Sequence, residues 1–390
     1  MLAATPDRRR LHPWAVALVC AALTLGGCSA TPTASDASRG QLVDALNTSI
    51  ETRDRAAFDA AFTNDSSAER RDELWANVTQ LTLATFTEDE KGLRIEWRVP
   101  GDTRSAWHLI DAPTACTAGR CAFKALEPRA GEPSPLWLVE PVQIERGEGW
   151  AVIRGDGARS WSKAAEASRA ELLAADLAPL SSDWDSELAL VAPGTVAGFE
   201  AVLGLPASEF ASTGALTWVA DFGLPKLDGV EPSSTAAAVR IVTNPDTTRA
   251  LSDDDQRLLI THEGVHVVTM GVGLPAEGRA WVSEGLSEVV ALATQPKHVE
   301  HFVKRLKDDC DALATPPSDE SFSGGIGMDA SMAELSYAQA WVLVTQLESK
   351  LGRAASREEM LRLWHGDDPQ LTSVDELGAA SVAWCQSVRA

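Results

Sequence analysis

The residue types best suited to chemistry lie together in residues 251–271, which read L-S-D-D-D-Q-R-L-L-I-T-H-E-G-V-H-V-V-T-M-G. Within this stretch His262, Glu263 and His266 form the pattern H-E-x-x-H. Side chains four apart project from one face of a helix, so the two imidazoles can bind one Zn²⁺ while Glu263 reaches a metal-bound water. A chain of this composition would contain the pattern by chance only roughly 0.01 times. The spacing therefore predicts a metal site.

A helix over this stretch is indicated at both of its ends. Ser252 is a favoured N-cap residue, the aspartates at 253–255 complement the helix dipole, and Gly271 is a plausible stop. Two histidines on one helix can also be packed core residues, so the helix by itself does not establish a metal site. Two further histidines, His298 and His301, lie three apart in a segment typical of a solvated helix face, which makes them weaker candidates.

A second helix is predicted over residues 278–294, which read G-R-A-W-V-S-E-G-L-S-E-V-V-A-L-A-T. This segment resembles the W-x-x-E-G-x-x-E signature of gluzincin metallopeptidases, in particular the peptidase MA-like group related to thermolysin and aminopeptidase N. The resemblance implies that Glu284, 18 residues after His266, is the third zinc ligand. A third ligand of this kind leaves the fourth position open for water, as in catalytic sites. The same resemblance implies that Glu288 hydrogen-bonds a ligand histidine; the alternative is an exposed helical glutamate.

The single tyrosine of the chain, Tyr337, lies in the stretch S-Y-A-Q-A-W at residues 336–341. It follows Glu284 by 53 residues and resembles the Y-x-x-A/S-W stretch of peptidase MA-like sequences. The resemblance implies that its hydroxyl donates a hydrogen bond to the oxyanion of a tetrahedral intermediate. A packed core aromatic is the alternative interpretation.

Together these resemblances imply a zinc metallopeptidase acting on a peptide or protein substrate. One Zn²⁺ held by His262, His266 and Glu284 would activate a water, and Glu263 would take the proton of that water and pass it to the leaving amine. In zincins the strand before the active-site helix often aligns the substrate by main-chain pairing, and residues 239–242 are the local candidate.

The charge balance excludes some functions. The 390 residues contain 56 Asp plus Glu against 34 Lys plus Arg, a formal net charge of −22. A nucleic-acid binder needs a basic face to replace phosphate counterions, so we expect no nucleic-acid partner. The acidity equally disfavours docking on an anionic bilayer by surface charge alone.

The first residues resemble the signal peptide of a bacterial lipoprotein. Three arginines at 8–10 precede an apolar run at 14–25, which ends in L-G-G-C at Cys28. This lipobox resemblance implies that Cys28 is lipidated and that the protein is exported and anchored to the outer face of the cytoplasmic membrane. The alternative is ordinary secretory cleavage with Cys28 as a bystander. Removing residues 1–27 leaves 363 residues at −24, and residues 28–40 are expected to be a flexible tether.

Export determines how the remaining cysteines are interpreted, because an oxidising compartment favours disulfides. Four cysteines lie beyond Cys28, and three pairings are possible. We expect Cys116–Cys121 with Cys310–Cys385. A structural metal knot is the alternative.

The chain is long enough for two domains of α+β class. Helical patterns in residues 41–62 and 72–81 precede strand-like runs at 82–87, 93–99, 106–110, 122–126, 136–144 and 150–153. Two helices followed by a curved antiparallel sheet resemble the nuclear-transport-factor-2-like fold over residues 41–155. Residues 155–163 are the expected joint, and residues 164–390 resemble the gluzincin metallopeptidase domain.

Two non-enzymatic interpretations stay open at this point. The protein could be a surface lipoprotein with a catalytically weak or inactive zinc domain that binds a ligand or protein partner. It could also be an envelope scaffold. The sequence contains no G-A-M-E-N-like aminopeptidase signature, which weakens the aminopeptidase variant of the peptidase hypothesis.

Overall fold

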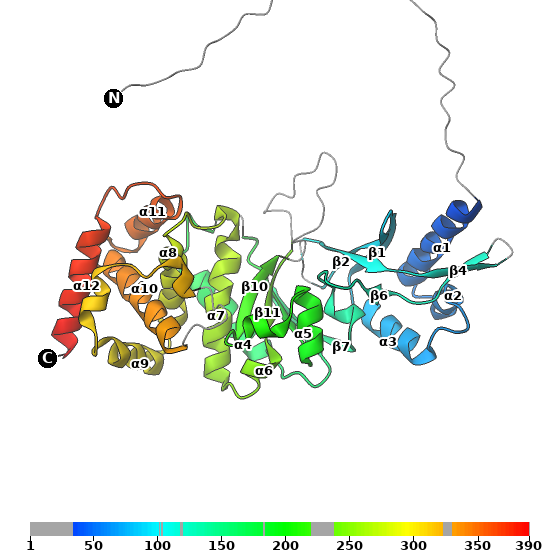
Figure 1. Ribbon diagram of the computed structural model, residues 1–390, viewed down its shortest axis with the longest axis horizontal. Coiled ribbons are helices and arrows are strands. Elements are labelled where there is room, and N and C mark those ends of the chain that lie inside the picture. Colours follow the sequence, from blue (N-terminus) through cyan, green and yellow to red (C-terminus); the bar gives the residue numbers. More distant parts are fainter. Residues whose placement is uncertain are drawn as a thin grey trace, which may run out of the picture.

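The computed structural model describes residues 34–389 with the exception of residues 101, 103, 118–119, 182–183, 220–237 and 323–329. The predicted signal peptide at 1–27 and the predicted lipidation site Cys28 therefore lie outside the described residues. Within the described part, no helix is both long and apolar enough to cross a membrane. The fold is mixed α+β, as expected, with an elongated outline in Figure 1.

The N-terminal part combines three helices with an antiparallel sheet (Figure 1). The helices are α1 (Ala34–Glu51), α2 (Arg55–Ala60) and α3 (Ala68–Val78). The sheet has the order β1 (Leu83–Asp89), β2 (Gly92–Arg98), β3 (Ala106–Asp111), β6 (Glu127–Pro128). Helix α1 begins inside the stretch 28–40, so the prediction of a flexible tether up to residue 40 is wrong.

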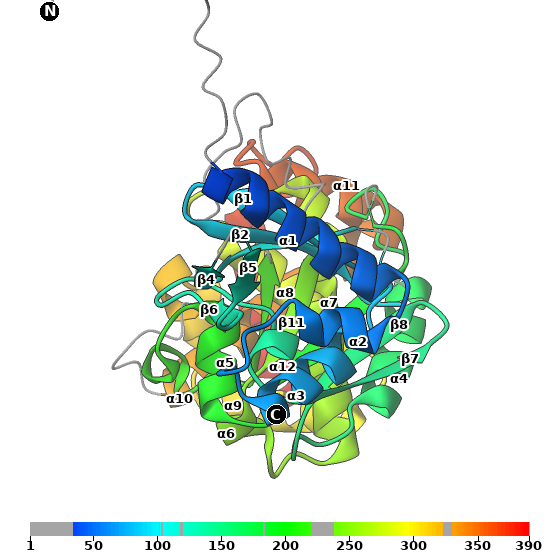
Figure 2. The ribbon, with the colours of Figure 1, turned by 90° about the vertical axis from the view of Figure 1, so that its right-hand side faces the viewer.

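Helix α1 packs across one face of this sheet (Figure 2). Alternate residues of β2, including Leu93, Ile95 and Trp97, are buried because side chains of a strand point to opposite faces with period two. The Asn47 amide of α1 hydrogen-bonds both main-chain groups of Phe86 in β1, each at 2.8 Å. The buried apolar contacts and these two hydrogen bonds therefore hold α1 on the sheet.

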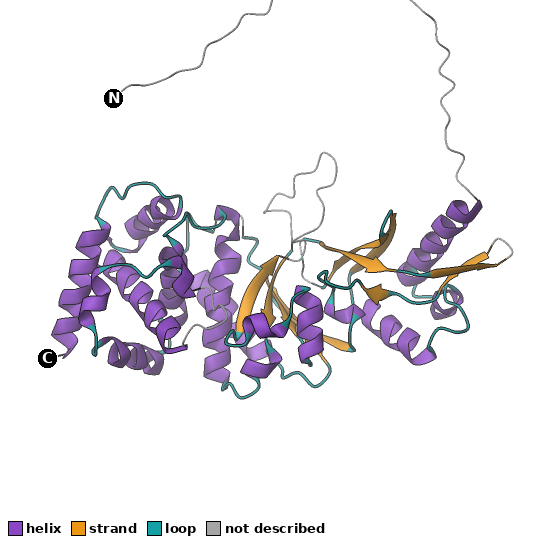
Figure 3. Cartoon of the chain, in the orientation of Figure 1, coloured by secondary structure: helices purple, strands orange, loops and turns teal. Residues whose placement is uncertain are grey.

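A second sheet of five strands occupies the middle of the molecule (Figure 3). Its order is β10 (Ala215–Val219), β11 (Val239–Thr243), β9 (Leu188–Ala192), β8 (Trp150–Gly155), β7 (Val142–Gly147). The pairs β11–β9 and β9–β8 are parallel, and the two outer pairs are antiparallel. Every residue of β9 is buried, as expected for a central parallel strand covered on both faces.

The sheet topology corrects the predicted composition of the N-terminal sheet. Strands β7 and β8 were expected in it but pair into the five-stranded sheet, where β8 lies parallel to β9. Residues 136–144 also differ, because they begin with a 3₁₀ turn at Leu136–Leu138. The apolar residues 151–153 of β8 are all buried, so this strand needs cover on both faces and takes an interior position. The segment 155–163, which was the expected joint, consequently starts at the end of β8, inside the five-stranded sheet.

The C-terminal part is helical, apart from short 3₁₀ turns (Figure 3). Helix α4 (Ser162–Ala174) and helix α7 (Asp253–Thr269) pack side by side, and α8 (Ala280–Leu292) lies between α7 and α10 (Ala330–Leu351). Helices α5 (Val196–Leu203) and α6 (Pro245–Thr248) lie beside the central sheet, and α9 (Pro296–Leu306), α11 (Arg353–Trp364) and α12 (Val374–Arg389) complete the C-terminal part (Figure 1). Residues of β8, β9, β11, α4, α7, α8 and α10 share one apolar core.

A buried ion pair joins the N-terminal sheet to the central sheet. Arg240 of β11 contacts Asp102, which follows β2, at 2.6 Å, and their side chains are only 4% and 7% exposed. The Arg240 guanidinium lies over the Trp97 ring at 5.2 Å, and Trp97 Nε1 donates to His108 Nδ1 at 3.0 Å. Burial, with Arg240 nearby, lowers the pKa of His108 to about 3, so its imidazole is neutral.

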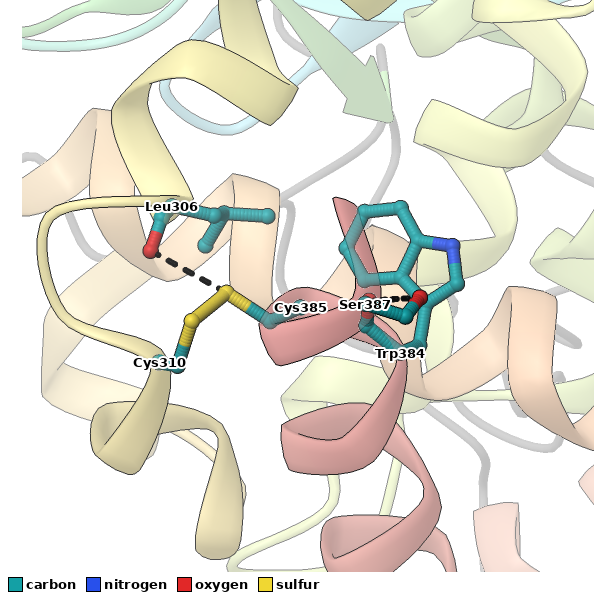
Figure 4. Close-up of a disulfide and its surroundings, with 5 residues drawn as sticks. All are labelled: Leu306, Cys310, Trp384, Cys385 and Ser387. Atoms are coloured by element: carbon teal, nitrogen blue, oxygen red, sulfur yellow. Dashed lines mark hydrogen bonds between the residues drawn. A yellow bond between two sulfur atoms is a disulfide. The ribbon is translucent and has the colours of Figure 1, made fainter. Parts of the chain in front are cut away.

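Two disulfides connect the four described cysteines, with the expected pairing. Cys116–Cys121 links β4 (Thr114–Thr117) to β5 (Arg120–Phe123), which form a small two-stranded sheet. Cys310–Cys385 links α12 to the 3₁₀ turn at Cys310–Ala314, where Cys385 Sγ also contacts the Leu306 carbonyl at 3.4 Å (Figure 4). The second disulfide spans 75 residues and the first spans 5.

Loop length predicts different contributions of the two disulfides to stability. Replacing Cys310 and Cys385 together by Ala is expected to lower the free energy of unfolding by about 4 kcal/mol, because the long loop regains more entropy when unfolded. The matched change at Cys116 and Cys121 is expected to cost about 2 kcal/mol. Urea unfolding of the oxidised proteins measures both values. Equal losses would contradict the loop-length explanation.

The neutral, buried His108 predicts a pH-dependent stability. Its folded pKa lies below the ordinary 6.5, so the unfolded chain binds the extra proton as the pH falls through that value. The contribution of the neutral His108 to the free energy of unfolding is present above about pH 6.5. It is lost as the pH falls toward 3, by up to about 1.4 kcal/mol per pH unit. Between pH 7 and pH 5 the free energy of unfolding should therefore fall by about 2 kcal/mol less in His108→Gln than in wild type. Urea unfolding at both pH values measures this, and an unchanged pH dependence in the variant would contradict it.

Candidate metal centre

Helix α7 carries both histidines of the motif. It begins with a capping box, in which Ser252 Oγ accepts the Asp255 N–H and the Asp255 carboxylate accepts the Ser252 N–H. This cap defines where the helix starts, and the four-residue spacing of His262 and His266 places them on one face. Their rings lie on one face with centroids 5.1 Å apart.

Helix α8 supplies the carboxylates and is capped from a distance. Its own N-cap residue makes no side-chain hydrogen bond. Instead, the Asp319 carboxylate accepts hydrogen bonds from Gly278 N at 2.6 Å and Ala280 N at 2.9 Å. Asp319 thereby satisfies main-chain donors that would otherwise be unpaired at the start of the helix that carries Glu284.

Two glycines of the motifs allow the supporting helices to approach closely. A Cβ atom at Gly264 would lie 2.6 Å from Leu172 Cδ1 of α4, and one at Gly285 would lie 2.4 Å from the Ala340 carbonyl oxygen of α10. Either distance is too short for a real Cβ atom. The glycine beside Glu284 therefore lets α8 pack against α10.

Three ligand atoms converge between α7 and α8. Glu284 Oε2 lies 3.3 Å from His262 Nε2 and 3.5 Å from His266 Nε2, and all three atoms lie within 4.8 Å of one another. Ligands bound tetrahedrally to zinc at 2.0–2.1 Å are about 3.3 Å apart, so the two measured distances fit a shared ion. This is the one His/Cys/Asp/Glu cluster found with metal-binding spacing among the described residues.

The second nitrogen of each imidazole is hydrogen-bonded. His262 Nδ1 lies 3.1 Å from Glu288 Oε1, which is the position predicted for Glu288. His266 Nδ1 lies 3.2 Å from Ser283 Oγ. These bonds point both Nε2 atoms toward Glu284, as partners of metal-bound histidines do.

Burial and charge act against each other in this cluster. Burial alone would lower the pKa of His262, but hydrogen bonds from its ring to Glu284 and Glu288 raise that pKa well above its ordinary value. Burial alone would raise the pKa of Glu284, but His266 and His262 hold that pKa well below its usual range. A bound divalent cation would take over this role of balancing the buried carboxylate charge.

Glu263 lies beside the ligands and is 8% exposed. Thr217 Oγ1 of β10 lies 2.9 Å from Glu263 Oε2 and 2.9 Å from the Glu263 carbonyl oxygen, so its hydroxyl can donate to either. Burial raises the pKa of Glu263 above its ordinary value. The carboxylate is therefore positioned by a neighbouring strand and is a better proton acceptor than an exposed glutamate.

Tyr337 also lies in the site. Its ring centroid is 5.7 Å from the His262 ring and 5.3 Å from the Phe322 ring, in edge-on arrangements. Burial and the neighbouring Glu284 carboxylate raise the pKa of the Tyr337 phenol well above its ordinary value. The hydroxyl thus keeps its proton and is available as a donor.

The two histidines of α9 lie in different environments. His301 is 63% exposed and pairs with Glu334, in agreement with a solvated helix face. His298 instead lines the cleft beside the metal centre, with Nε2 3.0 Å from Asp255 Oδ1. The solvated interpretation is wrong for His298, because α9 packs next to the start of α7.

The candidate centre lies in a cleft of about 890 Å³. Helix α7 forms its floor, β10 and the residues before it form one wall, and α9 and α10 form the opposite wall. Residues that line it include Phe210, Thr217, Leu258, His262, Glu263, His266, Glu284, Phe302, Glu334 and Tyr337.

The strand order of the central sheet also corrects the prediction of which strand borders the cleft. Residues 239–242 were the expected substrate-aligning strand, but they lie in β11, which is paired on both sides by β10 and β9. Its main-chain groups are therefore already used. Strand β10 pairs on one side only within the described residues, and its residues 215–217 line the cleft.

Three residues that support the site were not identified from the sequence. Ser283 directly precedes Glu284, so a search for hydroxyls next to the ligand could have found it. Thr217 lies 46 residues before Glu263 in a segment that carries no motif. Asp319 lies in a short turn after α9. Only the folded chain brings these last two to the site.

Comparisons with protein-family models, with curated proteins and with solved structures each gave no match. The function therefore has to follow from the chain's own residues and their positions.

The ligand geometry predicts one tight Zn²⁺ site per chain. Glu284→Gln keeps the shape of the side chain but removes the anionic ligand, so Zn²⁺ affinity should fall by more than about 100-fold. Glu288→Gln weakens only the support of His262 and should cost about 10–100-fold. Competition with a chromophoric chelator measures both values. Glu300→Gln, at an exposed position on α9, is the control, and equal affinity of Glu284→Gln and wild type would contradict the assignment.

Proposed function

We propose that the protein is a zinc-dependent peptidase that hydrolyses peptide bonds on the outer side of the cytoplasmic membrane. The observation that carries the proposal is the convergence of two imidazole Nε2 atoms on one oxygen of Glu284, at 3.3 and 3.5 Å. A buried glutamate, Glu263, lies beside them in an open cleft. Three ligands of this type leave a coordination position for water, which is typical of catalytic zinc sites.

His262, His266 and Glu284 would hold the metal. When bound there, zinc would supply Lewis acidity, lowering the pKa of a water and polarising the scissile carbonyl. Glu288 and Ser283 hold the two imidazoles in the required orientation through their Nδ1 atoms. The role of these two residues is to keep the ligand atoms in place during turnover.

Glu263 is the proposed general base. Its Oε2 atom is engaged by Thr217, which leaves Oε1 to accept a proton from the attacking water and return it to the leaving amine. The raised pKa that burial confers on this carboxyl supports both steps, because the group has to accept a proton and then donate it.

Tyr337 is the proposed donor to the oxyanion. It lines the same cleft and lies next to His262. Because its pKa is raised, the phenol is protonated at neutral pH and can donate a hydrogen bond to oxygen charge that develops in the transition state.

The proposed location is the outer face of the cytoplasmic membrane, reached through acyl chains on Cys28. The lipobox resemblance supports it, although Cys28 lies outside the described residues. The two disulfides add support, since such bonds persist in oxidising compartments. An anchor of this kind needs no basic surface, which agrees with the net charge of −22.

Substitution of the two proposed catalytic residues tests the mechanism. Glu263→Gln should lower kcat for a peptide library by about 10²–10⁴-fold while Zn²⁺ stoichiometry stays at one, because only the proton acceptor is lost. Tyr337→Phe should lower kcat by about 10²–10³-fold with little change in KM. Mass spectrometry of the digests gives the rates.

Glu300→Gln should cleave at the wild-type rate. The proposed function fails when zinc-loaded wild type cleaves no peptide, or when Glu263→Gln cleaves as fast as wild type. Full turnover by Tyr337→Phe would remove only this residue from the mechanism.

A further inference from the structure

The cleft continues past the metal centre in both directions along α7. Asp255 near the start of the helix and Met270 at its end both line it, with His262 and His266 between them. Residues 255 and 270 are 15 positions apart, which corresponds to about 22 Å of helix. An extended peptide covers about 3.3 Å per residue, so a length of roughly six or seven residues fits.

Residues 212–217, which include the first part of β10, line one wall of the cleft beside α7. The space in front of Gly214 is bounded by Leu259, one turn before the motif, while Thr217 reaches Glu263. These two contacts place the wall beside α7 from Leu259 to Glu263. Because the cleft lining continues beyond the ligands at residues 269–274, an extended chain that enters along this wall would pass the metal ligands in its middle, not at its end.

A terminal amine or carboxylate of a substrate would need an oppositely charged partner, because an unpaired charge is costly to desolvate. Among the described residues that line the cleft, none is lysine or arginine, and His298 is already paired with Asp255, so no cationic side chain there is left for a terminal carboxylate. Carboxylates that could hold a terminal amine are present in the lining. They are Asp255, Glu263, Glu284, Glu288 and Glu334.

Each of these carboxylates already has a partner within the chain. Asp255 bonds Ser252 and His298, and Glu334 bonds His301. Glu263 bonds Thr217, and the remaining two lie against the ligand histidines. None is left over as an anchor for the amino terminus of a substrate.

Apolar side chains line the cleft on both sides of the metal centre. Toward the start of α7 the lining includes Phe210, Leu251, Leu258, Leu259 and Phe302. Toward its end it includes Met270, Leu274 and Phe322. Leu274 is 88% exposed, the highest value among the exposed large apolar side chains of the described residues. A solvent-exposed leucine at the rim of a cleft gains most when a ligand covers it.

We infer that the cleft binds an extended internal segment of a polypeptide with apolar side chains flanking the metal centre, and that the enzyme is an endopeptidase. This inference rests on the proposed function for its chemistry but on the shape and lining of the cleft for its substrate class. The substrate is a protein segment that is unfolded or looped out, since an extended chain of roughly six or seven residues matches the length of the cleft along α7.

The first test compares blocked and unblocked peptides. A peptide of about eight residues with Leu-Phe at its centre, roughly 26 Å when extended, is prepared acetylated and amidated, and also with free termini. Zinc-loaded wild type should cleave the blocked and free forms with kcat/KM within about threefold, at a central bond. Cleavage of the free peptide alone, from one end, would overturn the inference while leaving the peptidase activity intact.

The second test measures binding without turnover. Zinc-loaded Glu263→Gln should bind the blocked peptide at least about tenfold more tightly than a blocked peptide of about four residues, by isothermal calorimetry. If wild type cleaves no peptide and Glu263→Gln still shows this length dependence, the peptidase proposal fails. The inference that the cleft binds an extended polypeptide segment then stands. Absence of binding by the blocked peptide would overturn the inference.

The third test addresses the apolar preference through the exposed Leu274. Leu274→Ser should lower kcat/KM about tenfold for blocked peptides with Leu or Phe next to the scissile bond, and less than about twofold for matched Ala peptides. Leu371→Ser, at a residue that is 49% exposed and not among the lining residues, is the control. An equal loss for both peptide classes, or none, would contradict the apolar contact.

Discussion

The site depends on one constraint, the burial of mutually attracting charged groups between α7 and α8. Glu284 and Glu288 approach the two histidines from the facing helix, at 3.1–3.5 Å. Such a cluster is stable only when each charge is paired, because desolvation of an unpaired charge costs several kcal/mol. The two helices therefore have to keep one register. Gly264 lets α7 pack closely against α4, and Gly285 lets α8 pack closely against α10.

Residues distant in sequence stabilise this pair of helices and complete the site. Asp319 caps α8, Thr217 holds Glu263, and Tyr337 comes from α10 on the other side of α8. The central sheet carries Thr217 on its outermost described strand, so the same strand positions Glu263 and borders the cleft. The position of Glu263 and the shape of the cleft both depend in this way on the packing of one sheet edge against α7.

The N-terminal part connects to this centre through β11. The pair of Arg240 and Asp102 is buried, and Arg240 also lies over Trp97, so this contact is both electrostatic and apolar. Strand β11 lies next to β10, which reaches Glu263. The N-terminal sheet is thus joined to the central sheet by a buried contact.

The sequence by itself determined the local features, because these follow from spacing and from residue chemistry. The H-E-x-x-H helix with its Ser252 cap, the placement of Glu284 and Glu288 on a second helix, the α+β class and the disulfide pairing all agree with the structure. Only the tertiary structure decided which strands share a sheet, and it moved β7 and β8 away from the N-terminal sheet. It also placed Thr217 and Asp319 at the site and made β10 the border of the cleft. The physical reason is that strand pairing and side-chain contacts between distant segments depend on the burial of whole faces, which no local pattern encodes.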